Sequence, residues 1–425
     1  MLSRSSASLL LGLLALAGCP ASATGSPDRP DRPDRPDRPD REAPPFTPPQ
    51  APADDVRAQA AAMNGFGVDL YKVVGAAEGD VFLSPPSVGA AFAMVWAGAE
   101  GQTAEQLAKA LHQTLPPGRA HPALGAALGA GQTATQPTFA VANRLWGAGE
   151  DFLPEYLALT REAYGAELQR VDFRAAPEPA RETINDWVAA RTRDRIKDLL
   201  PRGTINALTR LALTNAVYFK GSWKTKFEER ATQDGPFTLA DGARVQTKLM
   251  RQELSAAYHE GDGFALVELP YEGERFSMVV IVPARHDGLP ALEAGLTGDA
   301  LAGWIGAARP RKVRVVLPRL KIEASLELRA AMQALGVHDV FGEAADLSGM
   351  NGKAQDLYVS AAVHKAFVEV NEEGTEAAAA TGVVVGARSA PAPTPEVRAD
   401  RPFLFLVRDR ETGLIWFMGR ETDPR

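Results

Sequence analysis

Residues 374–389 read Gly374-Thr375-Glu376-Ala377-Ala378-Ala379-Ala380-Thr381-Gly382-Val383-Val384-Val385-Gly386-Ala387-Arg388-Ser389, and this stretch decides how the rest of the chain is interpreted. It continues the apolar run Tyr358–Val370, which is typical of a buried strand. Alanine is a poor strand former, and large apolar side chains are few here. The segment could therefore be a loop in one state and a strand in another. A flexible Ala/Gly linker explains the composition equally well.

A two-residue alternation shows what such a strand would bury. The one acidic residue, Glu376, would point to the opposite face together with Ala378 and Ala380. The first face would be small near its start and more apolar further on, so it could be buried without stranding a charge. That face would carry Thr375, Ala377, Ala379, Thr381, Val383 and Val385.

Composition excludes several classes of function. The chain has 425 residues, is 45% hydrophobic and carries a formal net charge of -7, which argues against nucleic acid as a partner. The single cysteine, Cys19, leaves no intramolecular disulfide and no cysteine-based zinc site. The six histidines show no metal-ligand spacing, so we expect neither a metal nor another cofactor.

The N-terminus carries a targeting signal. Arg4 precedes the apolar run Leu9–Leu16, which is too short to span a bilayer. The following Leu16-Ala17-Gly18-Cys19 looks like a bacterial lipobox, in which the thiol is lipidated and the chain is cut before it. Ordinary secretion, with cleavage after Ala23, is the alternative. We expect residues 1–18 to be a signal peptide and the protein to be exported, lipid-anchored in the envelope or else secreted.

A spacer separates this signal from the folded part. Residues 27–41 are five consecutive Pro-Asp-Arg repeats, and residues 44–52 add more prolines. Dense proline excludes helix and central strand, and the charges keep the segment solvated. A ligand site built from Asp and Arg is the functional alternative. We expect residues 19–52 to be a disordered linker and residues 53–425 to form one folded domain.

The folded part mixes early helices with late strands, which favours an α+β fold over alternating α/β units. Ser84 and Pro85 are typical of a helix start. Helical patterns occur at Met63–Val74, Phe152–Ala163, Arg181–Leu200 and Leu326–Leu335, and strand patterns at Phe139–Leu145, Leu211–Phe219, Phe264–Leu269, Phe276–Val282, Val313–Ile322, Tyr358–Val370, Phe403–Val407 and Ile415–Met418.

Several short motifs are distributed over about residues 55–425. They are Asp80-Val81-Phe82-Leu83-Ser84-Pro85-Pro86-Ser87, Leu213-Thr214-Asn215-Ala216-Val217-Tyr218-Phe219-Lys220-Gly221-Ser222-Trp223, Ala345-Asp346-Leu347-Ser348-Gly349-Met350, Val363-His364-Lys365-Ala366, Asp400-Arg401-Pro402-Phe403-Leu404-Phe405 and Phe417-Met418-Gly419-Arg420. These motifs resemble those of the serpins, in the family's order and spacing. The resemblance implies a serpin fold with three β-sheets, about nine helices and an exposed reactive-centre loop.

The resemblance implies suicide inhibition of a serine protease. The protease forms an acyl-enzyme at the loop, and the cut loop then inserts into the main sheet. Counting from the hinge places the cut between Arg388 and Ser389, and Arg388 is the only basic residue between Thr375 and Arg398. A long cation suits a trypsin-like pocket. Cleavage near Val385 or Ala387 by an elastase-like protease is the alternative.

Other site residues follow from the same resemblance. The stretch from Ser389 to Phe403 is longer than in the commonest members, which affects the position of the cut. The implied roles are the hinge (Gly374, Thr375, Glu376, Ala377, Ala378, Ala379, Ala380), the shutter (Ser84, Ser87, Asn215, His364) and the breach (Trp223, Glu372, Arg319).

The expected function is irreversible inhibition of a trypsin-like serine protease by a monomer. Short hinge side chains favour inhibition, because they offer little resistance to insertion. A non-inhibitory binding or chaperone serpin, and an inhibitor of elastase-like or cysteine proteases, remain alternatives. We expect no enzymatic activity, because the sequence holds no GxSxG or SxxK motif.

Overall fold

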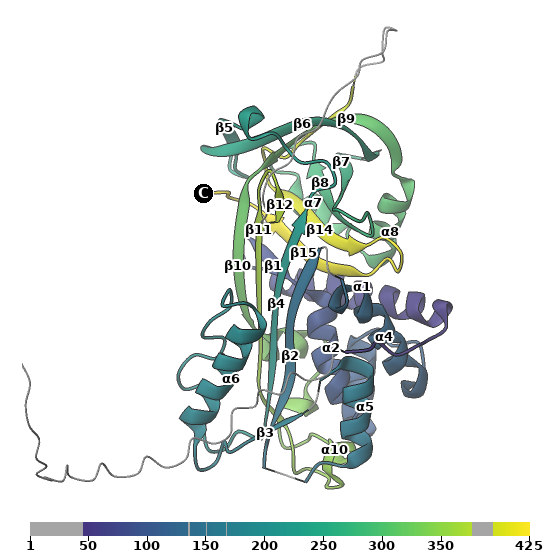
Figure 1. Cartoon of the computed structure of the whole chain (residues 1–425), viewed down its shortest axis with the longest axis vertical. Coiled ribbons are helices and arrows are strands. Elements are labelled where there is room, and N and C mark those ends of the chain that lie inside the picture. Colours follow the sequence, from purple (N-terminus) through teal and green to yellow (C-terminus); the bar gives the residue numbers. More distant parts are fainter. Residues whose placement is uncertain (1–45, 135–136, 150, 167, 376–393) are drawn as a thin grey trace, which may run out of the picture. The chain divides into compact units, whose positions relative to one another are not determined.

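The computed structural model describes residues 46–425 except 135–136, 150, 167 and 376–393 (Figure 1). The described residues form ten α-helices, which lie mostly in the first half of the chain. They are α1 (Ala53–Val74), α2 (Pro85–Trp96), α3 (Gly101–Ala110), α4 (Pro117–Gln132), α5 (Pro154–Tyr164), α6 (Pro177–Arg191), α7 (Leu289–Ala294), α8 (Gly298–Ala307), α9 (Leu328–Ala334) and α10 (Ser348–Asn351).

The strands lie mostly in the second half, so the expected α+β class is confirmed. They are β1 (Val81–Leu83), β2 (Thr138–Ala148), β3 (Gln169–Val171), β4 (Leu211–Ser222), β5 (Gln233–Thr238), β6 (Arg244–Gly261), β7 (Phe264–Pro270), β8 (Phe276–Pro283), β9 (Arg309–Pro318), β10 (Leu320–Glu327), β11 (Val359–Val370), β12 (Gly374–Thr375), β13 (Glu396–Arg398), β14 (Phe403–Asp409) and β15 (Ile415–Glu421).

One sheet has the order β10-β11-β4-β2-β3, with β12 also paired to β4 (Figure 1). Its central pair, β4 and β11, is parallel, whereas β11 pairs antiparallel with β10 and β4 antiparallel with β2. We call the boundary between β4 and β11 the central seam. Its entry end lies at Ser222 and Val370, where β11 leads towards residues 374–389. Its other end lies at Leu211 and Val359, and we call it the covered end because α6 and the residues that follow it pack over it.

The remaining strands form one hydrogen-bonded network, in the order β1-β15-β14-β8-β7-β6-β9-β13, with β5 on β6. The long strand β6 joins what would otherwise be two sheets. Residues 249–258 of β6 pair with β9, and residues 257–261 pair with β7. The expected three sheets are therefore two hydrogen-bonded networks among the described residues, because β6 continues from one sheet into the next.

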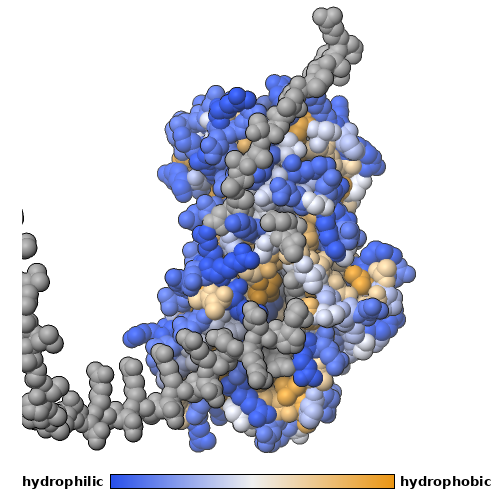
Figure 2. All heavy atoms as spheres, in the orientation of Figure 1, coloured by the Kyte–Doolittle hydropathy of each residue, from blue (hydrophilic) through white to orange (hydrophobic). Residues whose placement is uncertain are grey.

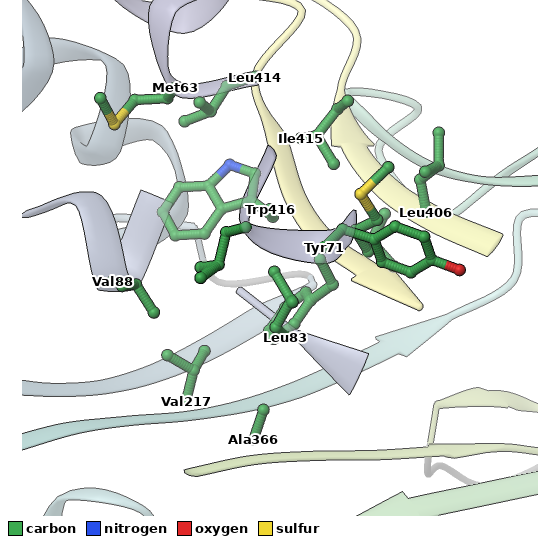
Figure 3. Close-up of a cluster of buried hydrophobic side chains, with 14 of the residues drawn as sticks. Met63, Tyr71, Leu83, Val88, Val217, Ala366, Leu406, Leu414, Ile415 and Trp416 are labelled. Carbon is green, nitrogen blue, oxygen red and sulfur yellow. The ribbon is translucent and has the colours of Figure 1, made fainter. Parts of the chain in front are cut away.

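The main core lies between the sheets and α1 and α2. Figure 3 shows part of it, where Trp416 lies among side chains that include Met63, Leu83 and Val88. Phe139 packs on Trp416 with ring centroids 4.6 Å apart. A fully buried large apolar side chain stabilises the folded state by about 2 kcal/mol, so burial on this scale holds the sheets and helices together.

A second core lies on the other face of the main sheet, beneath α6 and the connector 192–210. The helix contributes Ile184 and Val188, and the connector contributes Ile196, Leu199 and Ile205. The sheet meets them between the covered end and the middle of the seam, with three alanines and a valine, namely Ala212, Ala216, Ala361 and Val363. Small residues let the helix and connector lie close against the strands.

The helix that the sequence predicts at Arg181–Leu200 ends earlier, at Arg191. Arg193, Asp194 and Asp198 have positive φ angles of 54°, 59° and 51°, which no α-helix accommodates. Asn185 also accepts from the Leu200 backbone N–H at 2.9 Å, which folds the connector back onto the helix. Tertiary packing has therefore overridden a helical sequence pattern.

The packed part of the chain begins before the boundary expected at residue 53. Phe46, Pro48 and Pro49 lie against α4 and α5, where three glycines make room for them. A Cβ on Gly129 would come within 2.3 Å of Pro48, one on Gly125 within 2.8 Å of Pro49, and one on Gly165 within 2.5 Å of Phe46. No helix of the described part combines the length and the hydropathy that crossing a membrane requires.

Candidate functional site

The residues expected at the hinge and the reactive bond fall mainly outside the described part of the chain. Arg388 and Ser389 lie there, as do the hinge residues Glu376–Ala380. Gly374 and Thr375 are described and form β12, which pairs with Gly221 and Ser222 of β4. Gly374 has a φ of 132°, and a Cβ there would lie 2.1 Å from the Gly221 carbonyl oxygen. Only glycine fits this approach of the chain to β4.

Trp223 closes the entry end of the seam. Its indole Nε1 donates to the Asn371 carbonyl at 3.0 Å, and its backbone N–H donates to the Glu373 carbonyl at 2.9 Å. The indole also stacks on Tyr271 with ring centroids 4.6 Å apart and an interplanar angle of 6°. Trp223 therefore fastens the chain that leaves β11 to the end of β4.

Charged groups hold the same end. Glu372 is 3% exposed, and Arg319 Nη2 lies 2.8 Å from its Oε1. The Thr232 hydroxyl donates to Glu372 at 2.5 Å. Burial would raise the pKa of Glu372, but the hydrogen bonds from Arg319 and Thr232 outweigh it and hold the pKa below its usual value. Lys226 pairs with the neighbouring Glu373 at 2.7 Å.

A buried polar network crosses the middle of the seam. His364 of β11 lies opposite Asn215 of β4 in the strand register. The His364 Nε2 accepts from the Ser84 backbone N–H at 3.2 Å, so Nδ1 carries the proton and donates to the Asn215 Oδ1. Asn215 Nδ2 donates to the Ser87 hydroxyl at 2.8 Å. The network thus joins both strands of the seam to the start of α2.

Burial keeps His364 neutral, because it lowers the pKa of the imidazole to about 3. Sequence reasoning missed a third strand-borne member of this network, Asn143 of β2. It accepts from Asn215 Nδ2 at 2.8 Å and from the Ser87 hydroxyl at 2.8 Å. An amide that follows the apolar run Phe139–Ala142 within a predicted strand is the signal that could have identified it.

The covered end of the seam is fastened differently. Arg144 of β2 places its guanidinium carbon 4.3 Å from the ring centroid of Trp187 on α6 and 5.4 Å from that of Trp146. The two indoles meet edge to face, with centroids 5.5 Å apart. Cation–π contacts of this kind contribute about 0.5–2 kcal/mol. They tie α6 to β2, the neighbour of β4, and so help to hold the helix and the connector over the covered end of the seam.

The far anchor of residues 376–393 lies on β9. Strand β13 pairs with it in parallel, Glu396 opposite Arg314, and the Arg314 backbone N–H donates to the Pro395 carbonyl at 2.9 Å. Within the described ranges, no group of three or more His, Cys, Asp or Glu side chains could hold a metal ion.

This arrangement can accept a strand. The segment 375–388 contains 14 residues and follows β11, and β4 and β11 contain 12 residues each. A segment that reverses after Gly374 would run antiparallel to both strands of a parallel pair. The seam therefore has the direction and the length that the segment requires.

Comparison with known proteins agrees with this geometry. A family model described as Serpin (serine protease inhibitor) matches residues 61–424. A leukocyte elastase inhibitor from Bos taurus is 43% identical over 379 residues, which cover 86% of this chain and 99% of that protein. One from Homo sapiens is 41% identical and covers 84% of this chain and 97% of that protein.

Solved structures give the same result. Uncleaved ovalbumin is similar with a TM-score of 0.79 and 32% identity, covering 86% of this chain and 99% of that one. The serpin fold expected from the sequence is confirmed. The expectation of no enzymatic activity rested on missing motifs and is corrected here, because the family match describes the chain through what its members do, which is to inhibit serine proteases. The chain belongs to the serpin family of serine protease inhibitors.

Proposed function

We propose that the protein is an irreversible inhibitor of trypsin-like serine proteases and that Arg388-Ser389 is the bond they attack. One observation carries the proposal: a parallel seam whose strand β11 leads directly into a segment of matching length with small side chains. Family membership supplies inhibition of serine proteases as the general function. The specificity for arginine and the site residues are the finer part of the proposal.

The covalent step is ordinary acyl transfer that stops halfway. The protease serine Oγ attacks the carbonyl carbon of Arg388, and the protease histidine takes the hydroxyl proton and passes it to the departing amine. The bond to Ser389 breaks, Ser389 becomes a new N-terminus, and Arg388 remains bound as an ester. The free arm 375–388 can then extend the antiparallel pairing that Gly374 and Thr375 already make with β4, and so enter the seam.

Insertion supplies the free energy that halts the protease. A strand of 14 residues spans roughly 45 Å at about 3.3 Å per residue. About a dozen ladder hydrogen bonds at roughly 1 kcal/mol each contribute on the order of 10 kcal/mol. This is comparable to the whole stability of an ordinary domain, so a protease dragged along with the arm can be distorted before it deacylates.

The named residues would control this movement. Trp223 with the Glu372–Arg319 pair would hold the entry end until cleavage, and Gly374 would allow the reversal of the chain. Ser84, Ser87, Asn215 and His364, with Asn143 added, would let the middle of the seam part and close again. The small residues Thr375 and Ala377–Ala380 would enter first, with little steric resistance.

A second specificity is favoured by the relatives. The bovine and human proteins named above are leukocyte elastase inhibitors by name. Cleavage after Val385 or Ala387 would match an elastase-like pocket, and it would leave an arm of similar length. A non-inhibitory role remains a weaker candidate, because the hinge carries no proline and Glu376 falls on the face expected to stay outside.

Export and anchoring are also part of the proposal. We infer that residues 1–18 direct export, that Cys19 is lipidated at the bacterial envelope, and that residues 19–45 act as a spacer for a monomeric inhibitor. The lipobox-like sequence and the Pro-Asp-Arg repeats support this. A lipidated Cys19 would carry enough acyl chains for stable anchoring, whereas ordinary secretion would release the protein.

Mixing the protein with trypsin, and separately with leukocyte elastase, tests the function on a denaturing gel. We expect a high-mass complex with trypsin and, by mass spectrometry, a released fragment that begins at Ser389. Arg388→Ala should abolish the complex with trypsin only. Complete cleavage without a complex would show a non-inhibitory protein, and a fragment beginning at Gly386 or Arg388 would show elastase-like specificity.

A further inference from the structure

Strand β9 begins with an unusual concentration of cations. Arg309, Arg311, Lys312 and Arg314 occupy the first six positions of the strand with two other residues, and all four are exposed. The whole chain has a formal net charge of -7, so this strand runs against the balance of the molecule. Figure 2 shows hydrophilic residues over the end of the molecule where Figure 1 places β5, β6 and β9.

These charges are largely available. Lys312 pairs with Glu253 at 2.5 Å, and the Arg311 guanidinium lies 5.8 Å from the ring centroid of Tyr258. Arg309 donates to the carbonyls of the α8 end. Among the described residues, Arg314 has no carboxylate within ion-pairing distance. Most of this positive charge is thus left for a partner.

The position of the strand suggests which partner. Arg314 is hydrogen-bonded through its backbone to Pro395, the far anchor of the reactive segment. Six residues of sequence lie between Arg388 and Pro395. A protease bound at Arg388 would therefore lie within reach of the β9 cations before any insertion occurs.

Two simpler explanations account for less. Charges guard free strand edges, and β13 covers β9 only at Arg314–Val316, but one or two lysines would suffice for that purpose. A polyanion would need a surface of one sign. Glu253 and Glu396 lie opposite Arg314 on the neighbouring strands and would repel it. A protein surface that carries mainly acidic groups with some basic ones fits this pattern better.

We propose that the β9 cations form a docking surface for an acidic patch on the target protease. This inference depends on the proposed inhibitory function and deepens it, because it adds a contact outside the reactive bond. Opposite charges raise the rate of encounter and are screened by salt. The surface would select among proteases that share a specificity for arginine but differ in surface charge.

The anionic and cationic isoforms of trypsin test this selection, because both cut after arginine. The measured quantity is the association rate constant for complex formation at low and high salt. We expect the anionic isoform to be inhibited about tenfold faster at low salt, and the difference to shrink at high salt. The double variant Arg311→Gln/Arg314→Gln should remove most of this preference and leave the stoichiometry unchanged.

A matched control is Lys109→Gln/Arg174→Gln, which removes two exposed cations away from β9 and should preserve the preference. Complexes that form equally fast with both isoforms would overturn the docking surface alone. Failure of both isoforms to form a complex would overturn the proposed function and the docking with it. If dextran sulfate accelerates the wild type but not the double variant, β9 is a polyanion site and the proposal is wrong.

Discussion

The two ends of the central seam are held by opposite kinds of interaction. At the entry end, Trp223, Glu372 and Arg319 form hydrogen bonds and ion pairs, which water can replace as they break. At the covered end, α6 and the connector bury apolar side chains over Ala212 and Ala361, and nothing in water replaces that burial. The contrast indicates that a strand would enter easily at the first end and would meet its main barrier at the second.

The buried network of Asn143, Asn215 and His364 lies between these ends and couples both strands of the seam. Polar groups that are fully satisfied when the seam is closed must exchange partners when it opens. The network therefore determines the free energy that is needed to open the middle of the seam. Each of the following experiments alters one part of the seam.

The largest effect is expected from Thr375→Arg, at the start of the entering arm. A buried unpaired charge costs several kcal/mol, so insertion would stop before the protease is distorted. We expect the protein to become a substrate, with the stoichiometry of inhibition raised more than tenfold. Glu376→Arg, on the opposite face in the predicted alternation, is the matched control and should still inhibit. A Thr375→Arg variant that traps protease at the normal stoichiometry would refute the hinge assignment.

The next effect is expected from Asn215→Ala in the middle of the seam. The change leaves the His364 Nδ1–H, the Ser87 hydroxyl and the Asn143 amide without a shared partner. A buried polar group left unsatisfied costs about 1–3 kcal/mol, so the urea midpoint of the loop-out form should fall accordingly. An unchanged midpoint would show that the network contributes nothing to the closed seam. Asn206→Ala, in the connector, provides a control outside the network.

Acid should weaken the same network. The pKa of His364 is lowered to about 3 by burial, so between the unfolded value and pH 3 the unfolded chain binds a proton that the folded one does not. Stability should therefore fall as pH drops below about 6.5, by up to about 1.4 kcal/mol per unit from this residue. His364→Gln should flatten that part of the profile of urea midpoint against pH. Identical slopes in the two proteins would contradict a neutral, buried His364.

The smallest effect is expected from Arg144→Gln at the covered end. Loss of the cation–π contact with Trp187 removes about 1 kcal/mol of the interaction energy between β2 and α6. Because α6 must move to admit the incoming strand, weaker attachment of α6 should accelerate spontaneous conversion to the inserted form on warming about fivefold. A conversion rate that is unchanged or slower would show that the barrier to insertion does not lie at the covered end. Arg191→Gln, whose contact with Trp187 stays within α6, is the control.

The positions of many strands could be predicted from the sequence, but the pairing between the strands could not. The runs Leu211–Phe219 and Tyr358–Val370 are strands as expected, because their periodicity is local. Their parallel pairing is not local, and the sequence did not predict it. The continuation of β6 through two sheets was not expected, since nothing in its own sequence marks where one partner strand ends and the next begins.

Contacts between distant residues of the site were also beyond what the sequence could predict. Glu372 and Arg319 are 53 residues apart, and their pairing could be named only from resemblance, although the structure brings them together. Asn143 was missed because one amide in a strand does not indicate its partners. The start of the packed chain at Phe46 was missed because proline-rich sequence looks solvated, and the glycines that receive it lie on α4 and at the end of α5.

Heating the intact protein and the protein cut once after Arg388, side by side, tests the central claim most directly. If the closed seam is a strained state that the cut arm relieves, the cut form gains on the order of 10 kcal/mol. Its melting temperature should then rise by about 15 °C or more, although no residue has been added. Equal melting temperatures for the two forms would show that the arm does not enter the seam, and the account would fail.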